Sequence, residues 1–372
     1  MKKIDENLTG AVKVKQLVSQ VSKINRNEVL DVNSSLYSDI KKLIEETRYG
    51  VAQTINAGIT AMYWNIGKKI NDDILRNKRA EYGKQIIELL SKQLTEEYGA
   101  GWSTKQIRHC LRFVETFPDF KNVSSVWRQL SWTHFKTIIY INNELQREFY
   151  TQMCCVEMWS VRELRKKIDS MLFERTAISK KPDDLARLEL KKLGDGGELS
   201  PDLVFKNPYV LDFLNLKDTY QEKDLEMAIL KEIELFILEL GRSFTFVERQ
   251  KRMIIDNDDF YLDLLFYHRK LKRLIAIELK LGKFKASYKG QMELYLNWLE
   301  KHEMEDGEES PIGLILCAES GKEQIELLQL EKSNIKVAEY ITKILPKELL
   351  KKKLHKFYLE SKNLIESRFE DE

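Results

Sequence analysis

The sequence contains few cysteines and no long hydrophobic run, and each absence excludes a class of protein. The cysteines are Cys110, Cys154, Cys155 and Cys317. None belongs to a Cys-x-x-Cys pair or has a histidine at zinc-ligand spacing, so we expect buried free thiols in a reducing cytoplasm rather than a zinc site. No apolar run approaches the ~20 residues that span a bilayer, and none follows the basic start at residues 1–6 as it would in a secretory signal. We therefore expect a cytoplasmic protein with no membrane partner.

The excess of one charge sign is also small, but charge is unevenly distributed. The net charge is +2, yet residues 1–200 hold 33 Lys/Arg against 26 Asp/Glu, and residues 201–372 hold 28 against 33. Within the acidic half, residues 268–289 contain eight Lys/Arg and a single acid, Glu278. A phosphate backbone requires a basic stripe of this kind, although a solvated loop and helix face would have the same composition.

The length of 372 residues indicates more than one domain, and the residue pattern divides the chain. Residues 1–35 are polar and are expected to form a loose or helical arm. Residues 36–173 are patterned as helices nearly throughout, and capping boxes are predicted at Ser103 and Ser160, each followed three residues later by Gln or Glu. Residues 174–200 contain a Pro and a Gly-Asp-Gly-Gly run with few large apolar residues, which predicts a linker between domains.

Residues 201–345 have the pattern of an α/β domain. One helix is predicted over 222–240, where Gly241 ends it, and another over 289–301. The strand-like runs are 244–255, 260–267, 274–279, 311–317 and 334–340. Residues 346–372 are expected to form a charged terminal helix or tail.

Two neighbouring strands carry carboxylates in otherwise apolar runs. One strand contains Asp263, and the next ends in Glu278 and Lys280, which share a face because they are two residues apart. The short connection between these strands predicts an antiparallel hairpin. If its turn centres between Lys270 and Leu271, Asp263 lies directly opposite Glu278.

This arrangement points to metal-dependent hydrolysis of phosphodiesters. Like charges this close in a half-buried place cost several kcal/mol unless a cation lies between them. Two carboxylate oxygens with a backbone carbonyl and waters suit Mg²⁺ (or Mn²⁺), which acidifies water and neutralises phosphate charge. The ammonium of Lys280 would position the water and stabilise the oxyanion. A structural ion pair between Lys280 and Asp263 or Glu278 is the alternative explanation.

Two further polar residues lie on inward faces of the predicted helices. Helix geometry places Glu226 in the middle of the apolar stripe of helix 222–240, and Gln291 on the same face as Tyr295 and Trp298. Buried polar side chains need partners, and the edge of a metal site would supply them.

These residues resemble the PD-(D/E)xK nuclease superfamily and, more closely, the bacterial YhcG family. The resemblance to the nuclease domain is carried by residues 246–250, 261–269, 277–280, 290–292 and 312–317. The first half resembles the N-terminal domain of that family at residues 63–68, 130–134 and 159–164. Leu262 stands where the superfamily motif has a proline, which weakens the motif without breaking it.

The resemblance implies both a fold and a site. The fold would be an all-helical, helix-turn-helix-like N-terminal domain before a restriction-endonuclease-like α/β core of a helix, three antiparallel strands, a helix and a strand, with a four-stranded mixed sheet. The site would depend on Mg²⁺, with catalytic Asp263, Glu278 and Lys280, Glu226 as the acid of the first helix and Gln291 as the polar residue of the following helix. The partner would be nucleic acid; we favour DNA over RNA, although the sequence does not decide between them. A homodimer is left open because enzymes that cut both strands often pair two sites.

Basic residues predicted to contact nucleic acid fall in two places. They are Lys105, Arg108 and Arg112 on the helix after Ser103, and Arg269, Lys283 and Lys285 in the basic stripe. The first three lie outside the apolar face of their helix together with His109, and a short helix with a basic outer face suits a major groove. A plain amphipathic helix in a bundle explains them equally well. His268, at the hairpin tip, is expected to be a phosphate contact or a bystander.

Two other functions remain open from the sequence. A non-catalytic nucleic-acid-binding or assembly module would retain the fold without binding metal, although the intact Asp-Glu-Lys triad argues against it. A transcription factor using residues 100–116 would bind duplex DNA without metal, but this function does not explain the charges near 263–280.

Overall fold

The computed structural model describes residues 5–77, 80–119, 129–216 and 220–343, together with Leu349 and Lys352. The chain separates into two compact units, Met1–Trp132 and Thr133–Glu372. The terminal helix or tail predicted over 346–372 lies outside the described residues, apart from these two positions. None of the described helices combines the length and apolar character that a membrane span requires.

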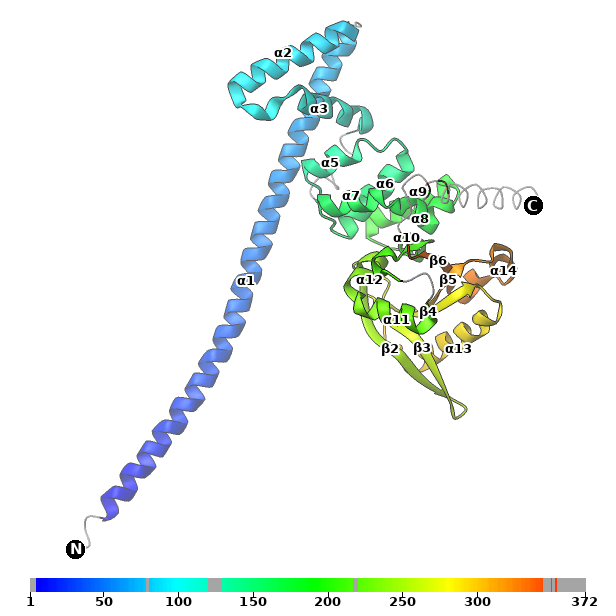
Figure 1. Ribbon diagram of the computed structural model, residues 1–372. Coiled ribbons are helices and arrows are strands. Elements are labelled where there is room, and N and C mark those ends of the chain that lie inside the picture. The colour runs from blue at the N-terminus through cyan, green and yellow to red at the C-terminus, as the bar shows by residue number, and fades with distance from the viewer. Residues whose placement is uncertain are drawn as a thin grey trace. The chain divides into compact units, whose positions relative to one another are not determined.

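The first unit is helical, as predicted. Its elements are α1 (Asp5–Asn77), α2 (Ala80–Tyr98), the 3-10 helix η1 (Ala100–Trp102) and α3 (Thr104–Thr116). In Figure 1, α1 continues without a break through the predicted boundary at residue 35, so the described part of the expected arm belongs to this helix.

A glycine allows α1 to pack closely against α3. A Cβ atom added to Gly67 would lie 2.1 Å from the backbone oxygen of Cys110, so no larger residue fits there without moving the helices apart. Nearby, Tyr63 stacks on Trp132 with ring centroids 4.5 Å apart. Residues 63–67 are therefore packing residues of this unit.

The helix α3 begins where its cap was predicted. Ser103 Oγ accepts a hydrogen bond from the backbone N–H of Gln106 at 3.3 Å. The buried residues of α3 are Ile107, His109, Cys110, Phe113 and Val114. The prediction that His109 lies on the outer face is wrong, because α3 packs against both α1 and α2 and its buried face is wider than one stripe.

The second unit opens with short helices. They are α5 (Trp132–Ile138), α6 (Glu144–Val156), α7 (Val161–Asp169), α8 (Leu172–Arg175), η2 (Ala177–Lys180), α9 (Asp183–Gly196) and α10 (Pro201–Val204). The predicted capping box at the start of α7 is confirmed, since Ser160 and Glu163 each accept a hydrogen bond from the backbone N–H of the other.

The segment predicted as a linker is mostly helical. α9 occupies most of residues 174–200 and packs against α6, with Ala186, Leu190 and Leu193 buried. Its glycine-rich end caps the helix instead of forming a flexible connection, since Gly197 has a left-handed φ of 70°. The segment predicted as a linker is therefore folded and lies within the second compact unit.

A six-stranded mixed sheet forms the core of the second unit, in the order β1-β6-β5-β4-β3-β2. Its strands are β1 (Tyr209–Val210), β2 (Phe244–Ile255), β3 (Asp258–His268), β4 (Arg273–Lys283), β5 (Ile312–Glu319) and β6 (Ile335–Ile341). β2, β3 and β4 are antiparallel to one another, whereas β4, β5, β6 and β1 run parallel. The α/β class is confirmed, but the implied four-stranded sheet is wrong in strand number. β1 is too short to leave a pattern in the sequence.

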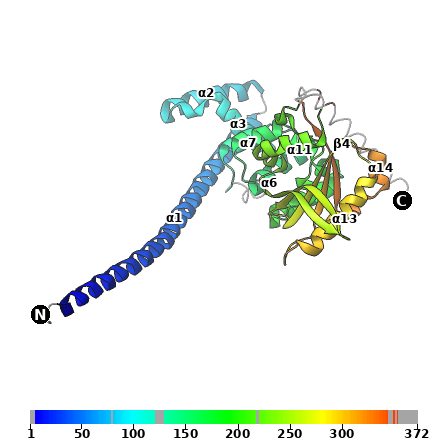
Figure 2. The ribbon, with the colours of Figure 1, turned by 60° about the horizontal axis from the view of Figure 1, so that its bottom comes forward.

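Helices cover both faces of this sheet, as Figures 1 and 2 show. On one face lie α11 (Glu222–Lys231) and α12 (Ile233–Leu240), and on the other lie α13 (Ser287–His302) and the short α14 (Lys322–Leu327). The single helix predicted over 222–240 is interrupted at Glu232, where φ is −108° and ψ is 33°. The apolar spacing continues across this residue, so the sequence does not mark the break. Gly241 ends α12 as predicted, with a φ of 140°.

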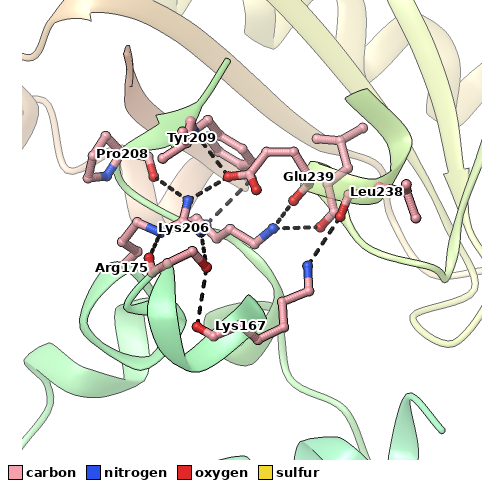
Figure 3. Close-up of polar contacts among 10 residues, drawn as sticks. Lys167, Arg175, Lys206, Pro208, Tyr209, Leu238 and Glu239 are labelled. Atoms are coloured by element: carbon pink, nitrogen blue, oxygen red, sulfur yellow. Dashed lines mark hydrogen bonds and ion pairs between the residues drawn. The ribbon is translucent and has the colours of Figure 1, made fainter. Parts of the chain in front are cut away.

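A buried charge network joins the short helices to the sheet (Figure 3). The guanidinium of Arg175, at the end of α8, is fully buried and donates hydrogen bonds to the carboxylate of Glu239 and, at 3.2 Å, to the backbone oxygen of Pro208. Glu239 also accepts a hydrogen bond from the backbone N–H of Val210 in β1 at 3.0 Å. One carboxylate of α12 therefore fixes α8 and the edge strand together.

The same network closes the end of α12. Lys206 donates to the backbone oxygens of Glu239 and Leu240, and Lys167 donates to that of Leu238 at 3.2 Å (Figure 3). These lysines satisfy carbonyls that a helix end leaves without partners. Burial alone would raise the pKa of Glu239, but Lys206 and Arg175 beside it lower the pKa to about 2.

We predict that Glu239→Gln lowers the free energy of unfolding of the full chain at pH 7 by about 3–5 kcal/mol, because it leaves the buried guanidinium of Arg175 without a counter-charge. The pKa of Glu239 falls on folding from 4.5 to about 2, so its contribution is complete above pH 4.5 and is lost as the pH falls toward 2. Urea unfolding at pH 7, 5 and 3.5 should show the difference from wild type narrowing at the lowest pH.

Glu234→Gln is the matched control, because Glu234 is exposed on the same helix. Its effect on the free energy of unfolding should stay within about 0.5 kcal/mol. Equal effects of the two substitutions would contradict the structural role given to the network.

Candidate active site

The site lies where β3 and β4 separate. Their ladder runs from the pair His268 and Arg273 to the pair Leu264 and Ile277, which is the predicted register. Beyond that point β3 pairs only with β2, and β4 pairs only with β5. Asp263 and Glu278 occupy the next position on each strand, so the gap between the strands begins at these carboxylates.

Three predicted residues meet at this gap. The backbone N–H of Leu279 donates to Asp263 Oδ2 at 2.8 Å, and that of Asp263 donates to Glu278 Oε1 at 3.4 Å. Lys280 Nζ lies 2.9 Å from Glu278 Oε2. Each carboxylate is therefore held by the other strand, and the ammonium balances one of the two negative charges.

The electrostatics of the site favour a bound cation. Glu278 is only 3% exposed, and burial, followed by repulsion from Asp263, raises its pKa to about 7. Burial also raises the pKa of Asp263. Burial alone would lower the pKa of Lys280, but Glu278 and Asp263 raise it above its ordinary value. One ammonium thus leaves a surplus of negative charge in a poorly solvated place.

The donor set fits a metal that retains water. Within the described residues, no group of three or more His, Cys, Asp or Glu side chains is placed to enclose an ion. A pair of carboxylates is the donor set from which Mg²⁺ is usually held, with waters completing its coordination. The residues present therefore suit an ion such as Mg²⁺, which keeps several waters, better than an ion whose ligands are all side chains.

The two supporting residues predicted on helices have different places. Glu226 is half-buried at the edge of the apolar stripe of α11 rather than in its middle, where Leu225 and Ile229 are buried. Its Oε2 accepts a hydrogen bond from Gln250 Nε2 at 3.0 Å, and the same nitrogen donates to Asp263 Oδ1 at 3.2 Å. Glu226 is thus linked to the site through Gln250.

Gln291 contacts a tyrosine rather than the carboxylates. Its Nε2 donates to Tyr295 Oη at 2.8 Å, and that hydroxyl donates to the backbone oxygen of Tyr261 at 3.4 Å. Tyr261 is two residues before Asp263 on β3, so the hydroxyl of Tyr295 lies near the site. The spacing of four residues on one helix places Gln291 and Tyr295 together, although only Gln291 was predicted as a site residue.

The predicted nucleic-acid contacts on the sheet are divided between its two ends. Lys283 and Lys285 are exposed just after the site, where Lys283 lies 3.6 Å from Glu319. Arg269 is exposed in the turn before β4, six residues after Asp263, which corresponds to about 20 Å of strand. Lys283 is five residues after Glu278, or about 17 Å, so these two residues lie on opposite sides of the carboxylates at similar distances along the strands.

The other predicted contacts lie on α3. Lys105 and Arg108 are exposed and Arg112 is partly buried. These residues belong to the first unit.

His268 is a core residue rather than a phosphate contact. It is 2% exposed, its Nδ1 accepts a hydrogen bond from the backbone N–H of Leu271 at 3.0 Å, and its ring packs edge-on against Phe244. Burial lowers the pKa of His268 to about 4, so it is neutral at pH 7. The bystander alternative is the correct one.

A mixed sheet covered by helices on both faces, with Asp263, Glu278 and Lys280 at two separating strands, defines a nuclease domain of the PD-(D/E)xK class. Comparison with known families gives the same class: residues 202–355 match the YhcG PDDEXK nuclease domain, and residues 39–175 match the DUF1016 N-terminal domain. The YhcG protein of Escherichia coli (strain K12) is 35% identical over 316 residues, which cover 77% of this chain and 84% of that protein. The chain belongs to the YhcG family.

Solved structures give weaker similarities. A repair endonuclease from Pyrococcus abyssi is 20% identical with a TM-score of 0.24, over 35% of this chain and 50% of that one. An EndoMS-dsDNA2 complex is 17% identical with a TM-score of 0.25, over 33% of this chain and 46% of that one. The chain thus spans about half the length of these structures, and the similarity is too low to support a functional argument.

We predict that Glu278→Gln raises the stability of the metal-free protein above pH 7. The pKa of Glu278 rises on folding from 4.5 to about 7, so its favourable contribution is complete below pH 4.5 and is lost as the pH rises through 7. A shift of this size corresponds to about 3 kcal/mol as an upper bound, and glutamine avoids that cost. The gain in urea unfolding should therefore be larger at pH 8 than at pH 5, with EDTA present throughout.

Glu234→Gln serves again as the exposed control, and its effect on the free energy of unfolding should differ little between pH 5 and pH 8. Loss of stability in Glu278→Gln at pH 8 would show that Glu278 is held as a structural ion pair, contrary to the prediction.

Proposed function

We propose that this protein is a divalent-metal-dependent endonuclease that hydrolyses phosphodiester bonds of DNA. The observation that carries the proposal is the pair of carboxylates at the separation of β3 and β4, with an ammonium 2.9 Å from one of them. Asp263 and Glu278 would hold Mg²⁺ (or Mn²⁺), which supplies charge neutralisation for the phosphate and acidifies a water.

The roles of the side chains follow from their places. Lys280, which is largely buried beside Glu278, would donate to a phosphate oxygen and stabilise the negative charge that develops there. Gln291 and Tyr295 would order the wall of the site on the α13 side. Exposed Lys283 and Lys285 would bind the phosphate backbone as it leaves the site.

DNA is proposed rather than RNA because of α3. This helix of 13 residues exposes Lys105 and Arg108, and the major groove of B-DNA admits a helix, whereas the major groove of A-form RNA is too narrow. The helix-turn-helix-like role of the first unit rests on the same two residues.

We predict that Asp263→Asn abolishes cleavage, with a loss of about 10³-fold or more, because the amide cannot replace a metal-binding carboxylate. The assay would measure cleavage of single-stranded, duplex and branched DNA, and of RNA, with Mg²⁺, Mn²⁺ or EDTA. Asp258→Asn is the matched control on the same strand, since Asp258 is exposed.

The outcomes separate three functions. Cleavage that is equal in Asp263→Asn and wild type would overturn the proposed site. DNA binding without cleavage, and without metal binding that depends on Asp263 and Glu278, would favour a non-catalytic binding or assembly module. Metal-independent binding to one duplex sequence would favour a transcription factor.

We also propose that two copies of the chain pair through α1, which would bring two sites to one duplex. Every described side chain from residue 36 to 52 is exposed. Tyr37, Ile44 and Val51 repeat at seven-residue spacing, and Ile55 and Met62 lie on a second row that is offset by four residues, with exposures between 41% and 71%. This is the spacing of a coiled-coil seam, although Lys41 and Arg48 at the intervening positions would weaken it.

We predict that wild type sediments as a dimer at micromolar concentration and that Ile44→Asp with Val51→Asp converts it to a monomer, because charges at seam positions oppose association. Analytical ultracentrifugation of the full chain measures this. Leu327→Asp, at an apolar residue that is 76% exposed on α14, is the control and should remain dimeric. An association free energy of roughly 5 kcal/mol corresponds to a dissociation constant on the order of 100 μM. A wild-type protein that is still monomeric at about this concentration would contradict the proposal.

A further inference from the structure

We propose that Gln250 is a positioning residue of this active site, which holds the carboxylates of Asp263 and Glu226 in a fixed arrangement. The inference rests on the proposed nuclease function and adds a residue that no sequence motif identified as functional. It stands on three observations: the backbone of Gln250, its place in the β2-β3 ladder, and the contacts of its amide.

The backbone of Gln250 is unusual for its place in the fold. Its φ is 48°, in the left-handed region that crowds the Cβ of any residue except glycine. Of the non-glycine residues with positive φ in the described part of the chain, the others lie in turns or at element ends, whereas Gln250 lies inside strand β2. Strained conformations of this kind persist where the surrounding structure requires them, and they are frequent at functional sites.

The pairing of β2 with β3 places Gln250 beside Asp263. Arg249 pairs with Leu264 and Lys251 pairs with Leu262, so Gln250 stands opposite Asp263 without forming a regular pair. Residues opposite each other on antiparallel strands share a face, so this position places Gln250 on the side of Asp263, and the left-handed backbone coincides with the missing regular pair. A nearby irregularity between Phe246 and Glu248 adds to the local distortion of β2.

The amide of Gln250 then bridges two carboxylates from different elements. Its Nε2 is 3.0 Å from Glu226 Oε2 on α11 and 3.2 Å from Asp263 Oδ1 on β3. An amide nitrogen carries two hydrogens, so one group satisfies both acceptors. As a neutral donor it reduces the repulsion between the carboxylates without adding a charge that would compete with a metal ion.

The orientation of Asp263 follows from this bridge. Its Oδ2 is bound by the N–H of Leu279 and its Oδ1 by Gln250, so both oxygens are fixed and their remaining lone pairs have defined directions. Without Gln250, the carboxylate would lose one of these two restraints and would turn away from Glu226. Hydrogen-bonding partners of metal ligands commonly change metal affinity or activity by about 10–100-fold.

The test uses Gln250→Ala and Gln250→Asn in the full-length chain. Asparagine tolerates a left-handed backbone but its amide is one methylene shorter, so it separates the contribution of the backbone from that of the bridge. Both variants should lower kcat for DNA cleavage by about 10–100-fold with KM changed less than about 3-fold, and should weaken Mn²⁺ binding in calorimetry by a similar factor.

The chain offers a closely matched control. Gln329 also has a φ of 48°, but it is exposed next to the 3-10 helix η4 (Leu330–Ser333) and lies outside the site. Gln329→Ala makes the same chemical change on the same backbone conformation. It should leave kcat and Mn²⁺ affinity as in wild type, whereas a general effect of removing a strained glutamine would appear in both variants.

A double-substitution cycle with Glu226→Gln tests the bridge directly. If Gln250 acts through Glu226 and Asp263, the effects of Gln250→Ala and Glu226→Gln on kcat should be less than additive. Wild-type levels of kcat and Mn²⁺ affinity in Gln250→Ala would overturn the positioning role while leaving the nuclease proposal intact. A wild-type protein that neither cleaves any substrate nor binds Mn²⁺ would overturn the nuclease proposal, and the role of Gln250 with it.

Discussion

The approach of two carboxylates across separating strands is the constraint on which the second unit depends. β3 and β4 form a ladder only up to Leu264 and Ile277, and beyond it each strand continues with a different neighbour. The change from antiparallel to parallel pairing at β4 therefore places Asp263 and Glu278 at an opening of the sheet. Backbone N–H groups and one ammonium offset part of their repulsion, and the proposed metal ion would offset the rest.

Much of this fold could be predicted because its signals are local. The apolar runs placed β2, β3 and β4 within a few residues, and the register assumed for the short turn between β3 and β4 is the one that the ladder has. The features that were missed depend on tertiary contacts. β1 has two residues and is held by its pairing with β6 and by the hydrogen bond from Val210 to Glu239. α9 is helical because its apolar residues pack against α6, although its sequence resembles a linker.

The residues of the candidate site were likewise predictable where their signals are local in the sequence. Asp263, Glu278 and Lys280 follow from strand alternation and one hairpin register, which are properties of the sequence. Gln250 does not, because its role depends on a left-handed residue inside a strand, and glutamine gives no sign of that conformation. For His268 the sequence suggested a role that the structure does not support. Its place near a turn suggested exposure, but Phe244 and the backbone of Leu271 surround it.

The contact between Arg175 and Glu239 also orders events during synthesis of the chain. The two residues are 64 positions apart, and the ribosome releases α8 long before α12. Until Glu239 emerges from the ribosome, the guanidinium of Arg175 has no carboxylate to pair with. Burying an unpaired charge costs free energy. The helices between residues 133 and 196 should therefore complete their packing only after the first part of the nuclease domain exists. A chain interrupted before residue 239 would remain loosely packed and open to proteolysis, so that unfinished copies are removed.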